Sequence, residues 1–122
     1  MTDDRREIDG REFARACERR ELPPGRSRLV YFDEERQVAL FNVGGELHAV
    51  TNICPHQHAP VIFEGFVEDC TVACPLHGWV YELDTGRALG GGARLKTYEV
   101  RVIDDVIFVE VPPDEEPAWM RG

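Results

Sequence analysis

Four residues that can bind a metal occur as two pairs on two short stretches of the chain. Cys54-Pro55-His56 supplies the first pair, and seventeen residues later Cys74-Pro75-Leu76-His77 supplies the second. Each pair offers one thiolate and one imidazole, which are a soft anionic donor and a neutral nitrogen donor. A proline follows each cysteine, fixes its own φ near about −65° and stiffens the loop. The residue types and their spacing predict a metal site built from two loops.

The sequence around these pairs resembles that of small soluble Rieske ferredoxins. The resemblance rests on CPHQHAP, FEGFV, CPLHGWVYELDTG and LKTYEVRVIDDVIFVEV, in that order, and covers roughly Leu22 to Val111. A Rieske centre is a [2Fe–2S] cluster in which two histidines replace two cysteines on one of the irons. The resemblance implies one such cluster per chain, with Cys54 and Cys74 on one iron and His56 and His77 on the other.

Other interpretations of the four residues are weaker. A zinc site also uses two cysteines and two histidines, but usually as a cysteine pair followed by a histidine pair. A role in packing alone would require four such residues to fall at matched spacing by chance. His58 and Cys70 each lie four residues from a cysteine of the set, so a different count could include either. The family pattern selects His56 and Cys74, and we expect His58 to be a solvated loop residue.

Residues beside the second pair differ from those of high-potential Rieske proteins. Those relatives place a serine after the loop glycine and a tyrosine two residues further on, both donating to cluster sulfurs. Here Trp79 takes the serine position and Tyr81 the tyrosine position, while Ala59 and Leu76 replace two cysteines that form a disulfide in those relatives. The resemblance implies a potential at the low end of the Rieske range of about −150 to +300 mV. We expect Gly78 to let its amide reach a sulfur.

The bulk composition fits a single acidic domain. The chain has 122 residues and a formal net charge of −9, with Lys96 as its only lysine against thirteen arginines. An acidic surface repels nucleic acid phosphates and anionic membranes, so we expect neither as a partner. It suits docking to a basic patch on a protein, where complementary charge raises the encounter rate. Acidity that serves solubility alone is an equally good interpretation.

No apolar stretch follows Met1, and the opening MTDDRREIDGREFARACERR is charged throughout. The sequence therefore predicts no signal peptide and no membrane anchor, and places the protein in the cytoplasm. The two cysteines outside the predicted ligand set, Cys17 and Cys70, are expected to be reduced there, with Cys70 buried as a small apolar residue.

Short apolar runs broken by turn residues indicate an all-β fold, a sandwich or barrel. These runs are RLVYF, VALFNV, LHAVTN, CTVAC, WVYEL, TYEVRV and VIFVEV. Hairpin connections are predicted at Val43 to Glu46 and at Asp84 to Arg87, and Asp104-Asp105 joins the last two strands. Near the N-terminus Asp9 could cap a helix over REFARACERR, whose residues are good helix formers. The resemblance implies instead a strand from Phe13 to Cys17, which we favour.

The resemblance implies an antiparallel base with a smaller cluster-binding part. We expect a single Rieske domain over residues 1–122, a cluster-binding subdomain over about 52–93 and a loose acidic tail over about 112–122, because VPPDEEPAWMRG is proline-rich and acidic.

The favoured function is that of a one-electron carrier, because the chain offers a cluster site and no separate substrate site. The resemblance implies a monomeric ferredoxin that takes electrons from a flavin-containing NAD(P)H reductase and passes them to a terminal oxygenase, often one that dihydroxylates aromatic rings. Trp79 and Pro60, beside the predicted ligands, could form an apolar docking collar.

Three rival functions remain open. CPLHGWVY also resembles the N-terminal domain of Rieske oxygenases, but those enzymes need a mononuclear iron on two histidines and a carboxylate. Only His48 and His58 remain outside the cluster set, and His48 is expected to be a half-exposed strand residue. A small subunit of a nitrite reductase has a related fold that often lacks the ligands. A cluster-based redox sensor would use the same site.

Overall fold

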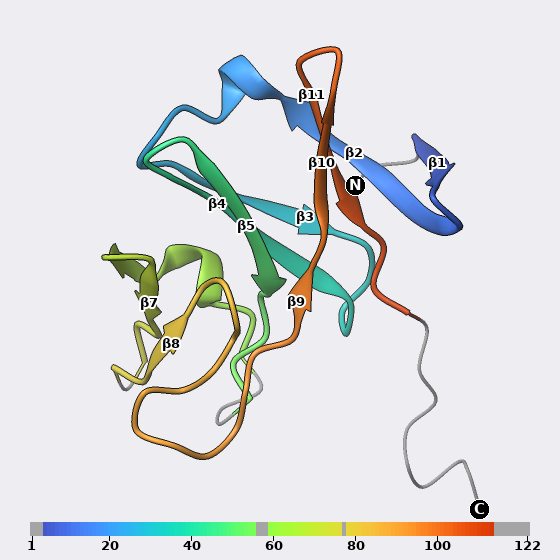
Figure 1. Ribbon diagram of the computed structural model, residues 1–122. Coiled ribbons are helices and arrows are strands. Elements are labelled where there is room, and N and C mark those ends of the chain that lie inside the picture. Colours follow the sequence, from blue (N-terminus) through green and yellow to red (C-terminus); the bar gives the residue numbers. More distant parts are fainter. Residues whose placement is uncertain (1–3, 56–58, 77, 114–122) are drawn as a thin grey trace, which may run out of the picture.

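The computed structural model describes residues 4–55, 59–76 and 78–113. Its strands are arranged in three antiparallel sheets, which confirms the predicted all-β fold (Figure 1). The first sheet has the order β1 (Arg5–Ile8), β2 (Arg11–Glu18), β11 (Val106–Glu110) and β10 (Val100–Ile103). The second has the order β3 (Ser27–Tyr31), β4 (Gln37–Val43), β5 (Glu46–Thr51) and β9 (Thr97–Tyr98). The small third sheet contains β6 (Phe66–Glu68), β7 (Thr71–Ala73) and β8 (Val80–Glu82).

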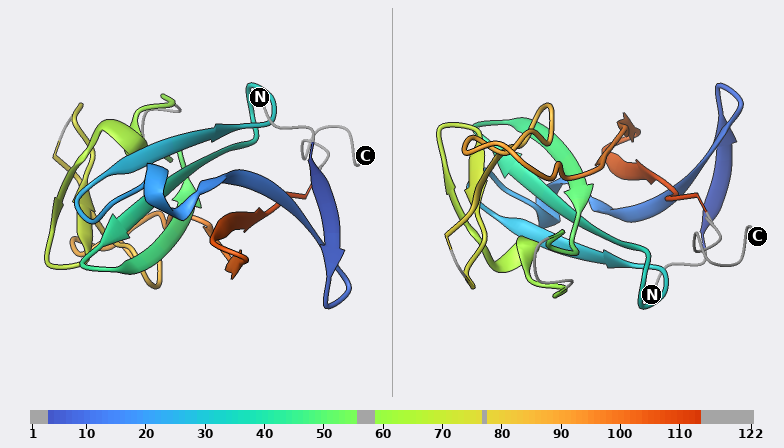
Figure 2. Two further views of the ribbon diagram at one scale, coloured as in Figure 1. Left: turned by 90° about the horizontal axis from the view of Figure 1, so that it is seen from above. Right: turned by 90° about the horizontal axis from the view of Figure 1, so that it is seen from below.

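The second sheet is the middle layer of the molecule (Figure 2). Successive side chains of a strand point to opposite faces. In β4, Val38 and Leu40 pack with β2 and β11 of the first sheet, whereas Ala39 and Phe41 pack toward the small sheet. This explains why VALFNV shows no alternation of polar and apolar residues, since both faces of β4 are buried.

The hairpin at Val43 to Glu46 and the connection at Asp104-Asp105 form as predicted. At Asp84 to Arg87 the chain turns, but β8 is followed by a single bridge of Tyr81 with Ala88 instead of a second strand. Gly44 and Gly45, between β4 and β5, both have positive φ, and so do Asp104 and Asp105 between β10 and β11. Two residues with positive φ match the right-handed twist of the flanking strands. The N-terminal prediction is also confirmed, because β2 includes the whole of Phe13 to Cys17. The strand β1 that pairs with it was not predicted.

Two short 3-10 helices complete the described residues, η1 (Arg19–Glu21) and η2 (Ile62–Glu64). Neither these nor any other helix of the described ranges has the length and apolar character needed to cross a membrane. The predicted tail lies beyond the described residues except for its first two, Pro112 and Pro113. The Pro112 carbonyl accepts a hydrogen bond of 3.3 Å from Nη1 of Arg36.

The small sheet belongs to an excursion between two neighbouring strands. β5 pairs with β9 through Ala49 with Tyr98 and Val50 with Thr97, and the Thr51 amide donates to the Lys96 carbonyl at 2.8 Å. The chain thus leaves the second sheet after Thr51 and returns beside it. Everything between, including both predicted metal-binding loops, is placed at one end of the molecule.

Candidate metal centre

The two predicted loops have the same length and the same closing hydrogen bond. The Cys54 amide donates to the Ala59 carbonyl at 2.9 Å, and the Cys74 amide donates to the Trp79 carbonyl at 2.8 Å. Each bond spans five residues and places the cysteine at the base of a six-residue loop. The histidine is the third residue of the first loop and the fourth of the second. The two loops therefore share a closing bond, although the spacing from cysteine to histidine differs between them.

The first loop is held by a buried side chain. Asn52 donates through Nδ2 to Oε1 of Gln37 at 3.0 Å, and its Oδ1 accepts from the Phe63 amide at 2.7 Å. Its carbonyl accepts from the Ile62 amide at 3.1 Å. Asn52 therefore joins β4, the start of the first loop and η2 at one fully buried position. Buried amide groups of this kind are nearly always hydrogen-bonded, because leaving them unpaired is costly.

The second loop is the connection of a hairpin. It joins β7 to β8, which pair through Thr71 with Glu82, Val72 with Tyr81 and Ala73 with Val80. Within the loop the Gly78 amide donates to the Cys74 carbonyl at 2.9 Å, and Gly78 has a φ of +71°. The expectation that this amide also serves a cluster sulfur stays a prediction. The backbone conformation is what requires glycine here.

Tyr81 and the two cysteines of the loops belong to one buried cluster. Both Cys54 and Cys74 are buried, and Tyr81 is fully buried with them among apolar side chains such as Ile62 and Leu83. The hydroxyl of Tyr81 is hydrogen-bonded to the Cys54 side chain and also feels the charge of Cys74. Burial, followed by the negative charge and hydrogen bond at Cys54, raises the pKa of Tyr81 far above its usual range. The hydroxyl thus keeps its proton and is a donor to sulfur.

This arrangement fits an iron–sulfur cluster. All four cysteines of the chain lie in the described residues and none forms a disulfide. Two buried thiols packed in one cluster with the Tyr81 hydroxyl can supply the soft, anionic half of a metal site. The predicted imidazole ligands, His56 and His77, lie outside the described residues, as does His58. Within the described ranges no three metal-binding side chains come together.

Cys70 does not belong to this group. It lies with Asp69 in the turn between β6 and β7, where both residues have positive φ, so β7 separates it from Cys74. Its side chain is partly exposed, which corrects the expectation of a buried apolar cysteine, and its Sγ is 3.5 Å from Nε2 of His48. His48 is a partly exposed residue of β5, as predicted.

The functional residues missed at the level of sequence are Asn52 and Gln37. An asparagine two residues before a cysteine has the appearance of a turn residue, and its burial depends on η2 folding back over it. One sequence signal could have suggested the role of Asn52. Between β5 and Cys54 it is the one polar residue, so its side chain is the one there that can satisfy backbone groups of the loop.

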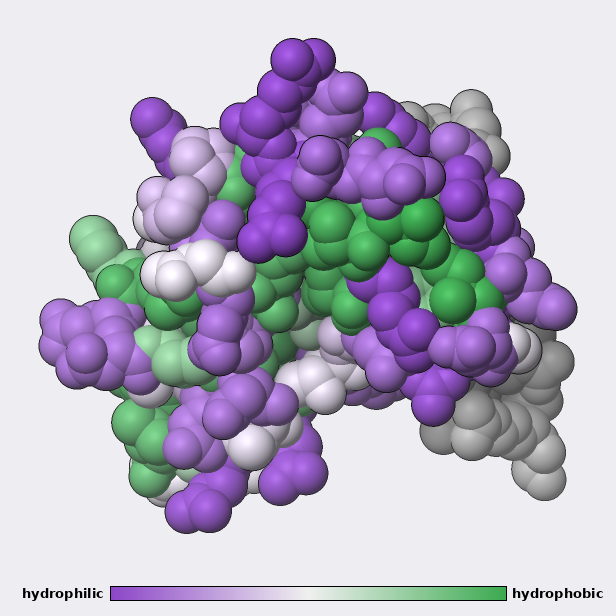
Figure 3. Space-filling model, turned by 45° about the horizontal axis from the view of Figure 1, so that its top comes forward, coloured by the Kyte–Doolittle hydropathy of each residue, from purple (hydrophilic) through white to green (hydrophobic). Residues whose placement is uncertain are grey.

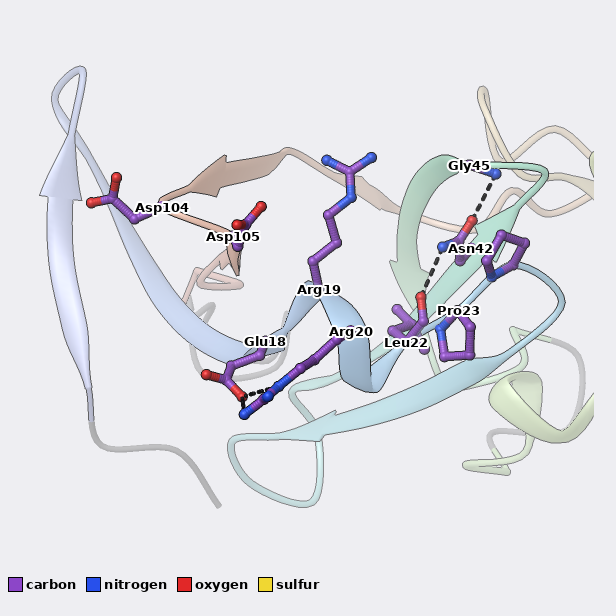
Figure 4. Close-up of a pocket in the computed structure, with 10 residues that line it drawn as sticks. Glu18, Arg19, Arg20, Leu22, Pro23, Asn42, Gly45, Asp104 and Asp105 are labelled. Carbon is purple, nitrogen blue, oxygen red and sulfur yellow. Dashed lines mark hydrogen bonds and ion pairs between the residues drawn. The ribbon is translucent and has the colours of Figure 1, made fainter.

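A separate pocket lies away from the two loops. It is an open pocket of about 750 Å³ whose lining includes Glu18, Arg19, Asn42 and Asp105. Figure 4 shows the Arg19 side chain extending between the β10–β11 turn and the β4–β5 turn, while Asn42 bridges the Leu22 carbonyl and the Gly45 amide. The pocket is at the start of β5, whereas Cys54 follows the end of β5. It is therefore separate from the two loops.

Comparison with known proteins gives a consistent result. The family model described as a Rieske-like [2Fe-2S] domain matches residues 12–110. The 3-phenylpropionate/cinnamic acid dioxygenase ferredoxin subunit of Shigella flexneri serotype 5b is 41% identical over 100 residues, which cover 80% of this chain and 92% of that protein.

Two solved structures show the same fold. A putative NADH-dependent nitrite reductase small subunit from Mycobacterium tuberculosis is 30% identical, with a TM-score of 0.75, covering 91% of this chain and 99% of that one. A chain in a complex of reduced oxygenase and oxidized ferredoxin in carbazole 1,9a-dioxygenase is 26% identical, with a TM-score of 0.72, covering 78% and 98%.

The match over most of the chain agrees with the two buried thiols and with the paired loops around them. The bound cofactor is a Rieske-type [2Fe-2S] cluster. The chain belongs to the Rieske-like [2Fe-2S] domain family.

Proposed function

We propose that this protein is a one-electron carrier whose electrons reach the terminal oxygenase of a dioxygenase system acting on aromatic compounds. The observation that carries the proposal is the packing of two buried cysteines and the Tyr81 phenol in one cluster at the base of two matched loops. The 41% identity to a dioxygenase ferredoxin subunit supports it. A Rieske cluster, when bound, accepts and releases a single electron.

The proposed ligands are Cys54 and Cys74 on one iron and His56 and His77 on the other. The chain's own residues prepare the sulfur side for this role. Apolar packing around both cysteines excludes water, and the Tyr81 hydroxyl donates to the Cys54 side chain. A donor to sulfur stabilises added negative charge and so raises the reduction potential.

The partners are protein redox partners. We propose that the electron donor is a flavin-containing NAD(P)H reductase, that the chain is a monomer and that it works in the cytoplasm. The absence of a disulfide among its four cysteines is consistent with a reducing compartment. The chain is proposed to be a single Rieske domain, residues 1–122, in which residues 52–93 form the cluster-binding part and about 112–122 the tail.

The ligand assignment is tested by substitution. His56→Ala and His77→Ala should each abolish stable cluster binding, measured as iron and sulfide content, visible absorption and a rhombic EPR signal after reduction. His58→Ala is the matched control in the same loop and should keep the cluster. Retention of iron and colour in either of the first two variants would overturn the assignment, and so would loss of both in the control.

The carrier role is tested by reconstitution. An oxygenase component of a dioxygenase system should turn over only when this protein and a flavin reductase are both added, and the protein should show no turnover alone. Turnover at the same rate without this protein would contradict the proposal.

A second function is supported by a specific observation, the similarity to the nitrite reductase small subunit. In that case the chain would be a fixed subunit of a larger oxidoreductase. Stable co-purification with a catalytic subunit, at equal stoichiometry through size exclusion, would favour this function over the mobile carrier.

A further inference from the structure

The outer face of the small sheet contains a row of four apolar side chains. Strand pairing aligns Phe66 with Ala73 and Ala73 with Val80, and the Leu89 amide continues the row by donating to the Val80 carbonyl at 2.9 Å. Their neighbours along the chain, such as Val72 and Tyr81, point inward and are buried. Phe66 is 79% exposed and Leu89 56% exposed. We call these four residues the apolar strip.

The next row on the same face is polar. It contains Glu68, Thr71 and Glu82, aligned by the same pairings, and Arg87, whose carbonyl accepts from the Glu82 amide at 2.8 Å. The face is therefore divided into an apolar half and a polar half. In Figure 3, residues coloured green for hydrophobic character reach the surface at the left edge, where the small sheet lies, next to purple hydrophilic ones.

The apolar half is the one next to the second loop. Ala73 directly precedes Cys74, and Val80 directly follows Trp79, so the loop begins and ends on the strip. Leu76, in the loop itself, is 47% exposed and Trp79 is 37% exposed. Electron tunnelling becomes slow beyond short distances, so a partner must approach the proposed ligands of this loop closely. A protein that does so also meets the strip.

Charge defines the chemistry of that partner. From Pro60 to Gly90 the sequence has five carboxylates, Glu64, Glu68, Asp69, Glu82 and Asp84, against a single arginine, Arg87. An apolar centre with an acidic border fits an apolar patch bordered by lysine or arginine, because complementary charge steers and orients the encounter. The strip is four side chains wide, whereas a stable interface uses about 20 to 30 residues on each side. This favours a transient partner over a second copy of the chain.

We propose that the apolar strip is the docking surface for the protein that accepts the electron, a partner with an apolar patch bordered by basic residues. This inference rests on the proposed carrier function. It extends the docking region beyond the residues beside the ligands to Phe66 on the edge strand β6 and to Leu89.

The test compares two oxidants of the reduced, cluster-loaded protein. Cytochrome c is a basic protein acceptor, and ferricyanide is a small acceptor that needs no docking surface. Phe66→Ser and Leu89→Ser should each slow the reduction of cytochrome c by about threefold or more, as expected for contacts at the centre of an interface. Neither should change the ferricyanide rate, the iron content or the reduction potential. Phe66→Leu should retain the wild-type rate with both oxidants.

Val102→Ser is the matched control, because Val102 is 38% exposed on β10 in the first sheet. Equal rates with cytochrome c for this control and both strip variants would overturn the proposal. So would sedimentation that shows a wild-type dimer converted to a monomer by Phe66→Ser, since the strip would then bind a second copy. Failure of the wild-type protein to reduce ferricyanide would instead contradict the proposed function.

Discussion

The two loops that carry the cysteine and histidine pairs share a length and a closing bond but are held in different ways. Both span six residues and close with an amide-to-carbonyl bond from the cysteine. The second loop lies between the paired strands β7 and β8, whereas the first is flanked only by the single bridge of Ile53 with Pro60. The Asn52 side chain supports the first loop in addition, through its contacts to Gln37 and Phe63. Extended strand pairing positions a loop by main-chain hydrogen bonds, and where the pairing is reduced to one bridge a buried side chain can satisfy further backbone groups.

The largest loss of stability is expected at Gly65, where the segment after η2 packs against β7, the strand that leads into the second loop. A Cβ atom on Gly65, which follows η2, would lie 2.5 Å from the Ala73 carbonyl oxygen and 2.7 Å from Cγ2 of Val72. Gly65→Ala must displace the strand that leads to Cys74 and should cost about 3 kcal/mol of stability. In a thermal melt of the cluster-loaded protein, Gly65→Ala should lose its cluster at a lower temperature than the wild type. Gly90→Ala, whose Cβ meets only Trp79 at 3.8 Å, should leave the thermal midpoint nearly unchanged.

The second largest loss of stability is expected when the side chain that holds the first loop is removed. Asn52→Ala leaves the Phe63 amide and Oε1 of Gln37 without their partner and should cost about 2 kcal/mol. Asn42→Ala is the matched control, because Asn42 is also buried and bridges Leu22 and Gly45 at the other end of the middle sheet. Both variants should unfold at lower temperature, but only Asn52→Ala should release iron faster to a chelator. Equal iron release would show that Asn52 has no special role in the first loop.

These two asparagines illustrate what sequence can and cannot predict. The strands on either side of the second loop follow from the apolar runs CTVAC and WVYEL, whereas the role of the cysteine and histidine pairs as ligands stays a prediction. The brace at Asn52 does not follow from the sequence, because it depends on η2 packing back across residues eleven positions away. The missing alternation in VALFNV is typical of a strand buried on both faces, but it does not tell which sheets cover β4. The strand β6 escaped prediction because its residues are exposed and show no alternation.

A smaller effect is expected within the second loop. Gly78 has a φ of +71° and open space around its Cα. Gly78→Ala should therefore cost about 1.5 kcal/mol through backbone strain alone. Gly25→Ala, at a φ of +89° and in equally open space far from the loops, should cost a similar amount. We expect faster cluster loss in chelator for Gly78→Ala only, and the same loss in both variants would indicate a global effect of stability.

The smallest effect concerns the residue that connects the loops. Tyr81 belongs to the hairpin of the second loop, yet its hydroxyl is bonded to Cys54 of the first. Tyr81→Phe removes one donor to sulfur, worth about 1 kcal/mol, and should lower the reduction potential on the order of 40 mV. Tyr31→Phe, on β3 of the middle sheet, serves as control. An unchanged potential in Tyr81→Phe, measured by redox titration, would leave Tyr81 a packing role only.

The return of the chain beside its point of departure has a consequence for engineering. Thr51 and Lys96 are joined by a hydrogen bond of 2.8 Å, so residues 52–95 begin and end on adjacent strands of one sheet. Such a segment is connected to the rest of the fold at two neighbouring positions. It could be grafted between two adjacent antiparallel strands of an unrelated scaffold, provided that the host offers an apolar face equivalent to the one formed by Ala39, Phe41 and Val50. The recipient sheet would keep its own strand order, because the graft replaces only a turn.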